Sequence, residues 1–303
     1  MTLHATSGAR PPLGAHPTSP TTFHTVQLGG VNVFYREAGS PQHPTVVLLH
    51  GFPSASHQYQ GLMDRLADRY HLIAPDYPGF GHSHHPEPAF AYTFDHLAAV
   101  VESLLVRLGL DRYSLYLQDY GGPVGLRLAA EHPERVQALI LQNTNAYEEG
   151  LSPAFDPVRT LWHRRDAETE AAVLPFFALD TTVFQHTQGA ADPARINPDV
   201  IDLDQANLDR PGAHAIQLDL LYDYRTNLDA YPAFQAYLRE HRPPTLIPWG
   251  KNDPFFTEAG ARAFLRDVPD AELHLLDAGH FALDDHADEI ASLIRTFLSH
   301  HLA

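Results

Sequence analysis

Apolar runs of strand length alternate along this chain with longer segments in which apolar residues recur at helical spacing. This alternation predicts an α/β protein with a mostly parallel sheet flanked by helices. The first two candidate strands are expected to pair as an antiparallel hairpin across Gly29-Gly30. The eight candidate strands span residues 25–28, 31–39, 45–51, 71–77, 113–119, 136–143, 245–253 and 271–277.

The segments between the strands suggest one core with an insertion. Residues 94–110, 121–132 and 287–298 carry helical stripes. In the first of these the stripe consists of Leu97, Val100, Val101, Leu104, Leu105 and Leu108. Residues 146–240 interrupt the alternation of strands and helices, because they are helical and contain no convincing strand. We therefore predict a helical cap at 146–240, a core of residues 23–145 and 241–303, and a disordered Pro/Gly/Ser/Thr-rich tail at 1–22.

Composition removes several classes of function. The net charge of −17 argues against binding to nucleic acid and to anionic membranes. The absence of cysteine excludes disulfides, thiolate chemistry and cysteine-based zinc sites. The chain has no HExxH pair, so no metal site is expected. No nucleotide or organic cofactor is implied either. The chain shows neither a signal-peptide pattern nor an apolar stretch of ~20 residues, and a cytoplasmic protein is predicted.

Three sequence features fall at the carboxyl ends of predicted strands, the edge where open α/β sheets place their sites. The stretch "YLQDYGGPVG" brings Asp119 to the end of the fifth strand, just before a glycine-rich helix start. The stretches "GKNDP" and "DAGHFALDD" bring Asp253 and His280 after the last two strands. The order nucleophile, acid, histidine predicts a catalytic triad. The backbone N–H groups of Phe52, in "HGFPS", and Tyr120 are expected to form an oxyanion hole.

Two of the triad residues have a structural alternative. Asp119 could simply cap the helix that follows it. Asp253 could be a turn residue, in which case Glu148 or Glu149, after the sixth strand, would supply the acid.

The motifs "QDYGGP" and "HGFP" resemble those of α/β-hydrolases in the haloalkane dehalogenase and epoxide hydrolase branch, and the resemblance covers residues 25–300. The first is close to the dehalogenase pattern Gln-Asp-Trp-Gly-Gly, and the second is closer to epoxide hydrolases. The resemblance implies an α/β-hydrolase fold with an inserted cap, and a hydrolase whose nucleophile is aspartate.

An aspartate nucleophile changes the expected reaction. A carboxylate with an ordinary pKa near ~4 is ionised at neutral pH and can displace a leaving group from saturated carbon. His280 would then activate water to hydrolyse the Asp119 ester, while Asp253 orients the imidazole. We expect cleavage of a carbon–halogen bond, with epoxide opening as the alternative. A carboxylesterase and a non-catalytic ligand-binding member of the fold rank lower.

The two substrates differ in how the leaving atom is stabilised, and this chain departs from the dehalogenase pattern. Tyr120 stands where that family has tryptophan, and Phe52 stands where many members bind halide through asparagine. Tyr120 and Pro123 also replace the arginines with which fluoroacetate dehalogenases hold a carboxylate, so a small, largely apolar, uncharged substrate is expected. Candidate contacts from the cap are Trp162, His163, Tyr222 and Tyr224, which could equally be packing residues.

Overall fold

The computed structural model describes residues 20–83 and 90–302, so most of the predicted tail lies outside the described residues. An eight-stranded sheet runs through the molecule in the order β1-β2-β4-β3-β5-β6-β7-β8. β2 is antiparallel to both of its neighbours, and all pairs from β4 to β8 are parallel. The predicted fold class is therefore confirmed. The strands are β1 (Thr22–Leu28), β2 (Val31–Ala38), β3 (Thr45–Leu49), β4 (His71–Pro75), β5 (Tyr113–Gln118), β6 (Val136–Gln142), β7 (Thr245–Gly250) and β8 (Glu272–Leu276).

The first two strands form the predicted hairpin. Leu28 pairs with Val31 across a two-residue turn. Gly29 and Gly30 both have positive φ, 54° and 93°, a backbone conformation that glycine adopts without steric cost.

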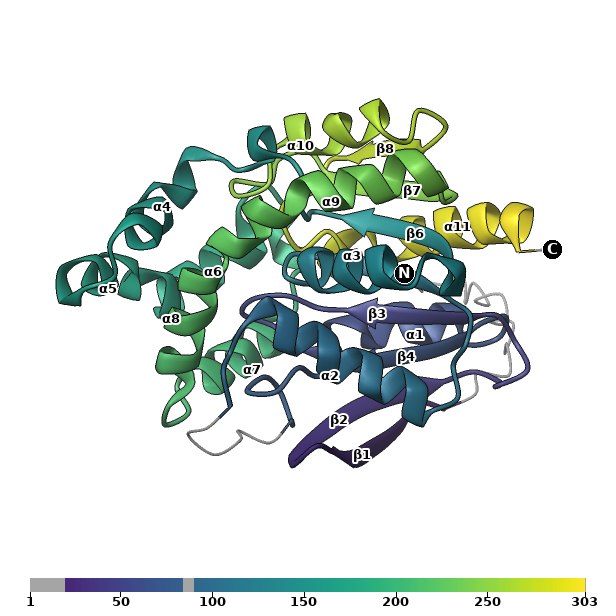
Figure 1. The fold of residues 1–303 in the computed structure, drawn as a ribbon, viewed down its shortest axis with the longest axis horizontal. Helices are drawn as coiled ribbons and strands as arrows, with labels where there is room; N and C mark the ends of the chain where they lie inside the picture. The colour runs from purple at the N-terminus through teal and green to yellow at the C-terminus, as the bar shows by residue number, and fades with distance from the viewer. Residues whose placement is uncertain (1–19, 84–89, 303) are drawn as a thin grey trace, which may run out of the picture.

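Helices cover both faces of the sheet, because its inner strands are buried on both sides. Val47 and Leu49 of β3 pack toward α2 and α3, while Val46 and Leu48 pack toward α1 and α11. The two layers lie in front of and behind the sheet in Figure 1. The helices are α1 (Gln60–Leu66), α2 (Phe94–Arg107), α3 (Gly121–Glu131), α4 (Asp156–His163), α5 (Ala167–Val173), α6 (Leu179–Thr187), α7 (Pro198–Leu208), α8 (Ala213–Asp223), α9 (Arg225–His241), α10 (Glu258–Ala263) and α11 (Leu283–His301).

Helices α4 to α9 form one insertion between β6 and β7. Figure 1 shows α4 to α8 beyond the arrowheads of β3 and β6, at the carboxyl edge of the parallel strands. Several polar contacts tie the insertion to the core, for example those of Asp223 and Asn227. The Phe94 backbone N–H donates to Asp223 Oδ2 at 2.8 Å, and Arg127 Nη1 donates to Asn227 Oδ1 at 2.7 Å. The inserted helices therefore cover the edge at which the polar loop residues emerge.

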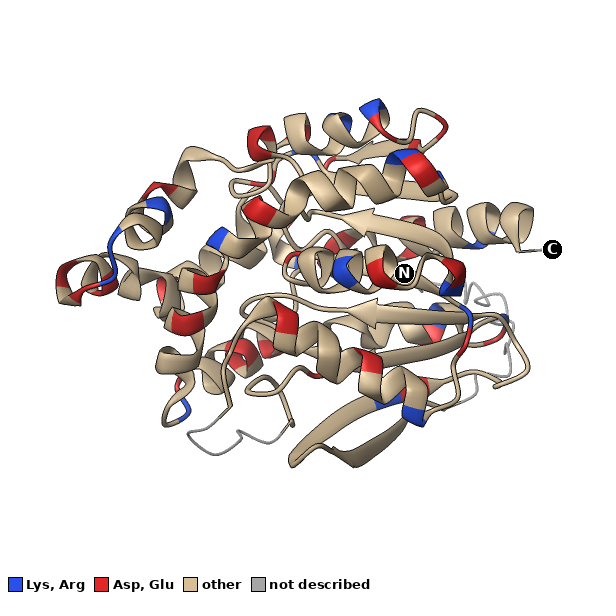
Figure 2. Cartoon of the chain, viewed as in Figure 1, with Lys and Arg blue, Asp and Glu red and all other residues tan. Residues whose placement is uncertain are grey.

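The surface carries charges of both signs. Acidic residues, 37 against 20 Lys and Arg, are spread over the helices, with basic residues between them (Figure 2). Within residues 20–83 and 90–302, no helix has both the length and the apolar character needed to cross a membrane.

Candidate active site

Asp119 occupies a strained corner between β5 and α3. Its φ of 50° lies in the left-handed region, which costs a non-glycine residue about 1–3 kcal/mol. Hydrogen bonds hold this corner: the Asp119 N–H donates to Asn143 O at 3.0 Å, and Thr144 Oγ1 donates to Asp119 O at 2.8 Å. A Cβ atom at Gly121 would lie 2.0 Å from Leu49 O. Only glycine therefore lets the helix start this close to β3.

The Asp119 carboxylate lies in a cradle of backbone donors. Phe52 N donates to Asp119 Oδ1 at 2.7 Å, and the Tyr120 backbone N–H also donates to the carboxylate. These are the two groups predicted to form an oxyanion hole. A Cβ atom at Gly51 would lie 2.1 Å from Oδ1, so this close approach requires glycine. Oδ2 is the oxygen that faces His280, with Nε2 3.9 Å away.

Burial changes the acidity of this carboxyl. Desolvation raises the pKa of Asp119 to about 6, although His280 and the backbone N–H groups of Phe52 and Tyr120 act in the opposite direction. The expectation of an ordinary pKa was therefore wrong, because the sequence does not show how deeply the side chain is buried. The carboxyl is still mostly ionised at neutral pH.

His280 and Asp253 form a hydrogen-bonded pair. His280 Nδ1 lies 2.8 Å from Asp253 Oδ2, so Nδ1 is the donor and Nε2 is the ring atom turned toward Asp119. Asp253 is itself held by Phe255 N at 2.7 Å and by Asn143 Nδ2 at 2.8 Å. Burial alone would lower the pKa of His280, but the charge and hydrogen bond of Asp253, with the charge of Asp119, raise it above its ordinary value. The structure thus brings the three predicted residues together.

Glu148 and Glu149 do not reach the histidine. Both are exposed in the short 3₁₀ helix Glu148–Gly150, and Glu149 forms an ion pair with Arg266. Asp253 is accordingly the carboxylate that contacts His280.

Two site residues were missed from the sequence. Gln118, the last residue of β5, places its amide Nε2 3.0 Å from His280 Nε2, and Gln58 Nε2 donates to Gln118 Oε1 at 3.4 Å. Asn143 follows β6 with a φ of 43° and bonds Asp253. The available signal was that Gln118 and Asn143 both stand at the ends of strands next to the site. Asparagine also tolerates positive φ, which suits Asn143 to the turn after β6.

A small apolar cavity of about 30 Å³ opens above Asp119 and His280. Four of its lining residues carry a polar side chain: Asp119, Tyr120, Gln185 and His280. The remaining lining residues are Phe52, Phe155, Val158, Phe176, Leu221, Phe255 and Phe256.

The predicted cap contacts Trp162, His163 and Tyr222 do not line this cavity. The Trp162 indole N–H donates to Leu221 O at 2.7 Å and is not free for a ligand. His163 is exposed. The ring of Tyr222 lies under the guanidinium of Arg225, 3.7 Å from its centroid. Trp162 and Tyr222 therefore pack within the cap, and His163 faces solvent.

Tyr224 also lies outside the cavity lining, although it is close to it. Its buried ring stacks on Trp162 at 5.7 Å and lies 6.1 Å from the ring of Tyr120. Its hydroxyl shares a hydrogen bond with Tyr231, whose own hydroxyl accepts from Asn145 Nδ2 at 3.0 Å. The Tyr224 hydroxyl is thus engaged by Tyr231.

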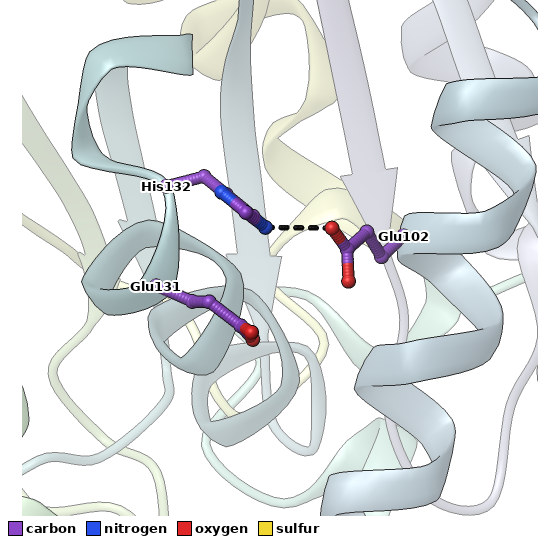
Figure 3. Close-up of side chains that lie close together, drawn as sticks. All are labelled: Glu102, Glu131 and His132. Carbon is purple, nitrogen blue, oxygen red and sulfur yellow. Dashed lines mark ion pairs between the residues drawn. The ribbon is translucent and has the colours of Figure 1, made fainter.

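One group of potential metal ligands occurs among the described residues, and it is remote from this site. Glu102, Glu131 and His132 bring their ligand atoms within 4.8 Å of one another. His132 Nε2 forms an ion pair with Glu102 Oε1 at 2.6 Å (Figure 3). His132 follows α3, whose 11 residues put it about 16 Å from the Asp119 corner. The cluster takes no part in the candidate active site.

Comparisons with known proteins agree with this fold. The family described as alpha/beta hydrolase fold matches residues 44–287. The chain is 40% identical over 277 residues to an uncharacterized hydrolase of Saccharomyces cerevisiae, covering 90% of this chain and 95% of that protein. It is 30% identical over 298 residues to a haloalkane dehalogenase of Mycobacterium marinum, covering 93% of each.

A solved structure shows the same architecture. The crystal structure of a haloalkane dehalogenase from Bradyrhizobium elkani matches with a TM-score of 0.73 at 23% identity, covering 93% of this chain and 100% of that one. At this identity the match demonstrates the shared fold. The family match and the full-length relatives together show that the chain is a hydrolase of the α/β-hydrolase fold and belongs to its haloalkane dehalogenase branch.

Proposed function

We propose that this protein hydrolyses the carbon–halogen bond of small, largely apolar, uncharged haloalkanes through a covalent Asp119 ester. The observation that carries the proposal is the placement of Asp119: Oδ1 accepts a hydrogen bond from Phe52 N, and Oδ2 faces His280 beneath an apolar cavity. No lysine or arginine is among the described lining residues, which favours a substrate without a carboxylate.

In the first step, Asp119 Oδ2 attacks the carbon that carries the halogen. The C–O bond forms as the C–halogen bond breaks, and the bonding pair leaves with the halide, so no proton is transferred. Oδ1 becomes the carbonyl oxygen of the ester and keeps its hydrogen bond from Phe52 N, while the Tyr120 backbone N–H remains bonded to the Asp119 side chain.

In the second step, His280 Nε2 takes a proton from water as the water oxygen attacks the ester carbonyl. The negative charge that develops on Oδ1 is stabilised by the same two N–H groups. Collapse of the intermediate returns that proton to the departing alcohol oxygen and leaves Asp119 as a carboxylic acid. Release of the second water proton to solvent then restores the carboxylate. Because esterification removes the charge of Asp119, which raises the pKa of His280, the ester form favours the neutral imidazole that this step requires.

Epoxide opening is the second candidate, and one observation favours it. The Tyr120 hydroxyl is buried at the cavity and has no hydrogen-bond partner among the described residues, so it could protonate an epoxide oxygen. However, burial raises the pKa of Tyr120 well above 10, which makes the hydroxyl a weak acid. Neither Tyr222 nor Tyr224 lines the cavity. A halide, which leaves without a proton, therefore fits the site better.

A single-turnover experiment in ¹⁸O water tests the covalent route. With enzyme in excess over 1-bromobutane, the alcohol should carry ¹⁶O, because its oxygen comes from Asp119. Later turnovers should yield ¹⁸O alcohol, because water has replaced one carboxylate oxygen. Mass spectrometry of the alcohol and of the peptide containing Asp119 measures both.

The control reactions use 1,2-epoxybutane and ethyl butyrate under the same conditions. Alcohol that carries ¹⁸O in the first turnover would exclude the ester intermediate. Turnover of 1,2-epoxybutane with no reaction of 1-bromobutane would show that the protein hydrolyses epoxides rather than haloalkanes. Hydrolysis of ethyl butyrate, with no reaction of 1-bromobutane or 1,2-epoxybutane, would overturn both the haloalkane and the epoxide assignments.

The pH dependence of the first step should reflect the acidity of Asp119. With its pKa raised to about 6, the attacking carboxylate is lost as the pH falls through that value. We expect kcat/KM for 1-bromobutane to be about tenfold lower at pH 5 than on the plateau above pH 7. Initial rates between pH 4.5 and 8.5, with circular dichroism confirming the fold at each pH, measure this. A flat profile down to pH 4.5 would contradict the raised pKa.

A further inference from the structure

Gln185 places an unpaired amide at the active-site cavity. It lies on α6 of the insertion, is only 3% exposed, and lines the cavity together with Asp119 and His280. Its Nε2 atom is buried and has no hydrogen-bond partner among the residues that the structure describes. A buried N–H group without an acceptor destabilises the folded protein, so its persistence here points to an acceptor that arrives with the substrate.

Apart from the Tyr120 hydroxyl, which is also unpartnered among the described residues, the other N–H donors near the cavity are already engaged. Phe52 N and the Tyr120 backbone N–H both donate to Asp119. The Trp162 indole N–H donates to Leu221 O. Gln185 lines the same cavity as Asp119, so its amide is next to the space into which a leaving atom would pass.

The residue next to Gln185 holds α6 against the core. His186 Nδ1 lies 2.7 Å from Asp284 Oδ2 of α11, and His186 Nε2 lies 3.0 Å from Asp204 Oδ2 of α7. The His186 ring stacks on Phe281, the neighbour of His280, with centroids 4.1 Å apart. These buried contacts fix the position of Gln185 relative to the histidine of the triad.

We propose that the Gln185 side-chain amide binds the halide that leaves when Asp119 attacks. This inference rests on the proposed function and assigns the leaving-group contact within it. The amide N–H donates to the halide as negative charge builds up on it, while the C–halogen pair departs with the halide and Gln185 stays neutral. An amide cannot protonate an alkoxide, so this contact distinguishes halides from epoxides.

The test compares rates of ester formation in a background that cannot release product. In His280→Ala, adduct formation on Asp119 is followed by intact mass with 1-chlorobutane and 1-bromobutane. Adding Gln185→Leu should slow the adduct by about 10- to 100-fold, with the larger loss for chloride, which needs more stabilisation. Added bromide, as a competing ligand, should inhibit the Gln185→Leu variant correspondingly less. Trp162→Phe in the same background is the matched control and should change neither rate nor inhibition.

Each outcome separates this inference from the proposed function. Adduct formation at equal rates with and without Gln185→Leu would overturn the assignment of Gln185 while the ester route stands. No adduct in His280→Ala itself would overturn the proposed function. Slower reaction with 1,2-epoxybutane but not with the halides would also overturn the assignment. Should Gln185→Leu fail to fold, Gln185→Met, which keeps the length of the side chain, takes its place.

Discussion

His280→Ala is expected to stop turnover and to accumulate an alkyl group on Asp119. The first step needs only the carboxylate, whereas hydrolysis of the ester needs a base, and His280 Nε2 is the ring atom that faces Asp119 at 3.9 Å. Turnover should fall by about 10⁴-fold or more, as for other groups that act as a unit with the nucleophile. Intact mass after mixing with 1-bromobutane should show one added butyl group, and peptide mapping should place it on Asp119.

The matched control for this variant is His163→Ala, which removes an exposed histidine of the cap. It should retain turnover and accumulate no adduct. Loss of turnover in His280→Ala without any adduct from alkyl halides or epoxides would mean that the histidine is needed from the first step, as with a serine-type nucleophile. The ester route would then be excluded.

Asp119→Asn should abolish both steps. The amide keeps the shape of the side chain but has no charged oxygen with which to attack carbon. Turnover should be lost by about 10⁴-fold or more, and no adduct should form even when His280→Ala is combined with it. Steady-state rates and intact mass measure the two effects.

Asp277→Asn serves as the control, since Asp277 is an exposed carboxylate that pairs with Lys251 at 3.1 Å. Its activity should equal that of the parent protein. Thermal melts of the two variants separate loss of chemistry from loss of fold. Substantial residual turnover in Asp119→Asn would show that another group is the nucleophile.

The eight strands could be predicted because their apolar character is local. β3, β4, β5 and β7 are buried along their whole length, and parallel strands buried on both faces are continuous apolar runs in the sequence. The ends of elements were less accurate: β1 begins at Thr22 rather than 25, and α11 at Leu283 rather than 287. The short helices α1 and α10 were not predicted, since six or seven residues carry little periodicity.

The convergence of Asp119, Asp253 and His280 was also predictable, for a topological reason. The carboxyl ends of neighbouring parallel strands meet at one edge, so residues just after such strands lie close together whatever their separation in the chain. The hydrogen bond of 2.8 Å between His280 and Asp253 follows from that rule together with the fixed spacing of strands.

The cap side chains could not be predicted in this way. Trp162 and Tyr222 have the residue types expected of a leaving-group site. However, the Trp162 indole N–H donates to Leu221 O, and the Tyr222 ring packs against the Arg225 guanidinium. Gln185, which carries no sequence signal, lines the cavity instead. A helix turns side chains by a fixed angle per residue, but which face meets the core depends on packing between helices far apart in sequence.

The order of residues along the chain was thus enough to establish the α/β architecture and the meeting of the triad, since both follow from local hydrophobic periodicity and strand direction. Packing in three dimensions decided the rest: the pKa of Asp119, raised to about 6 by burial, and the choice of Gln185 rather than Trp162 or Tyr222 at the cavity. Both depend on which surfaces exclude water, and that is a property of distant segments in contact rather than of any one stretch.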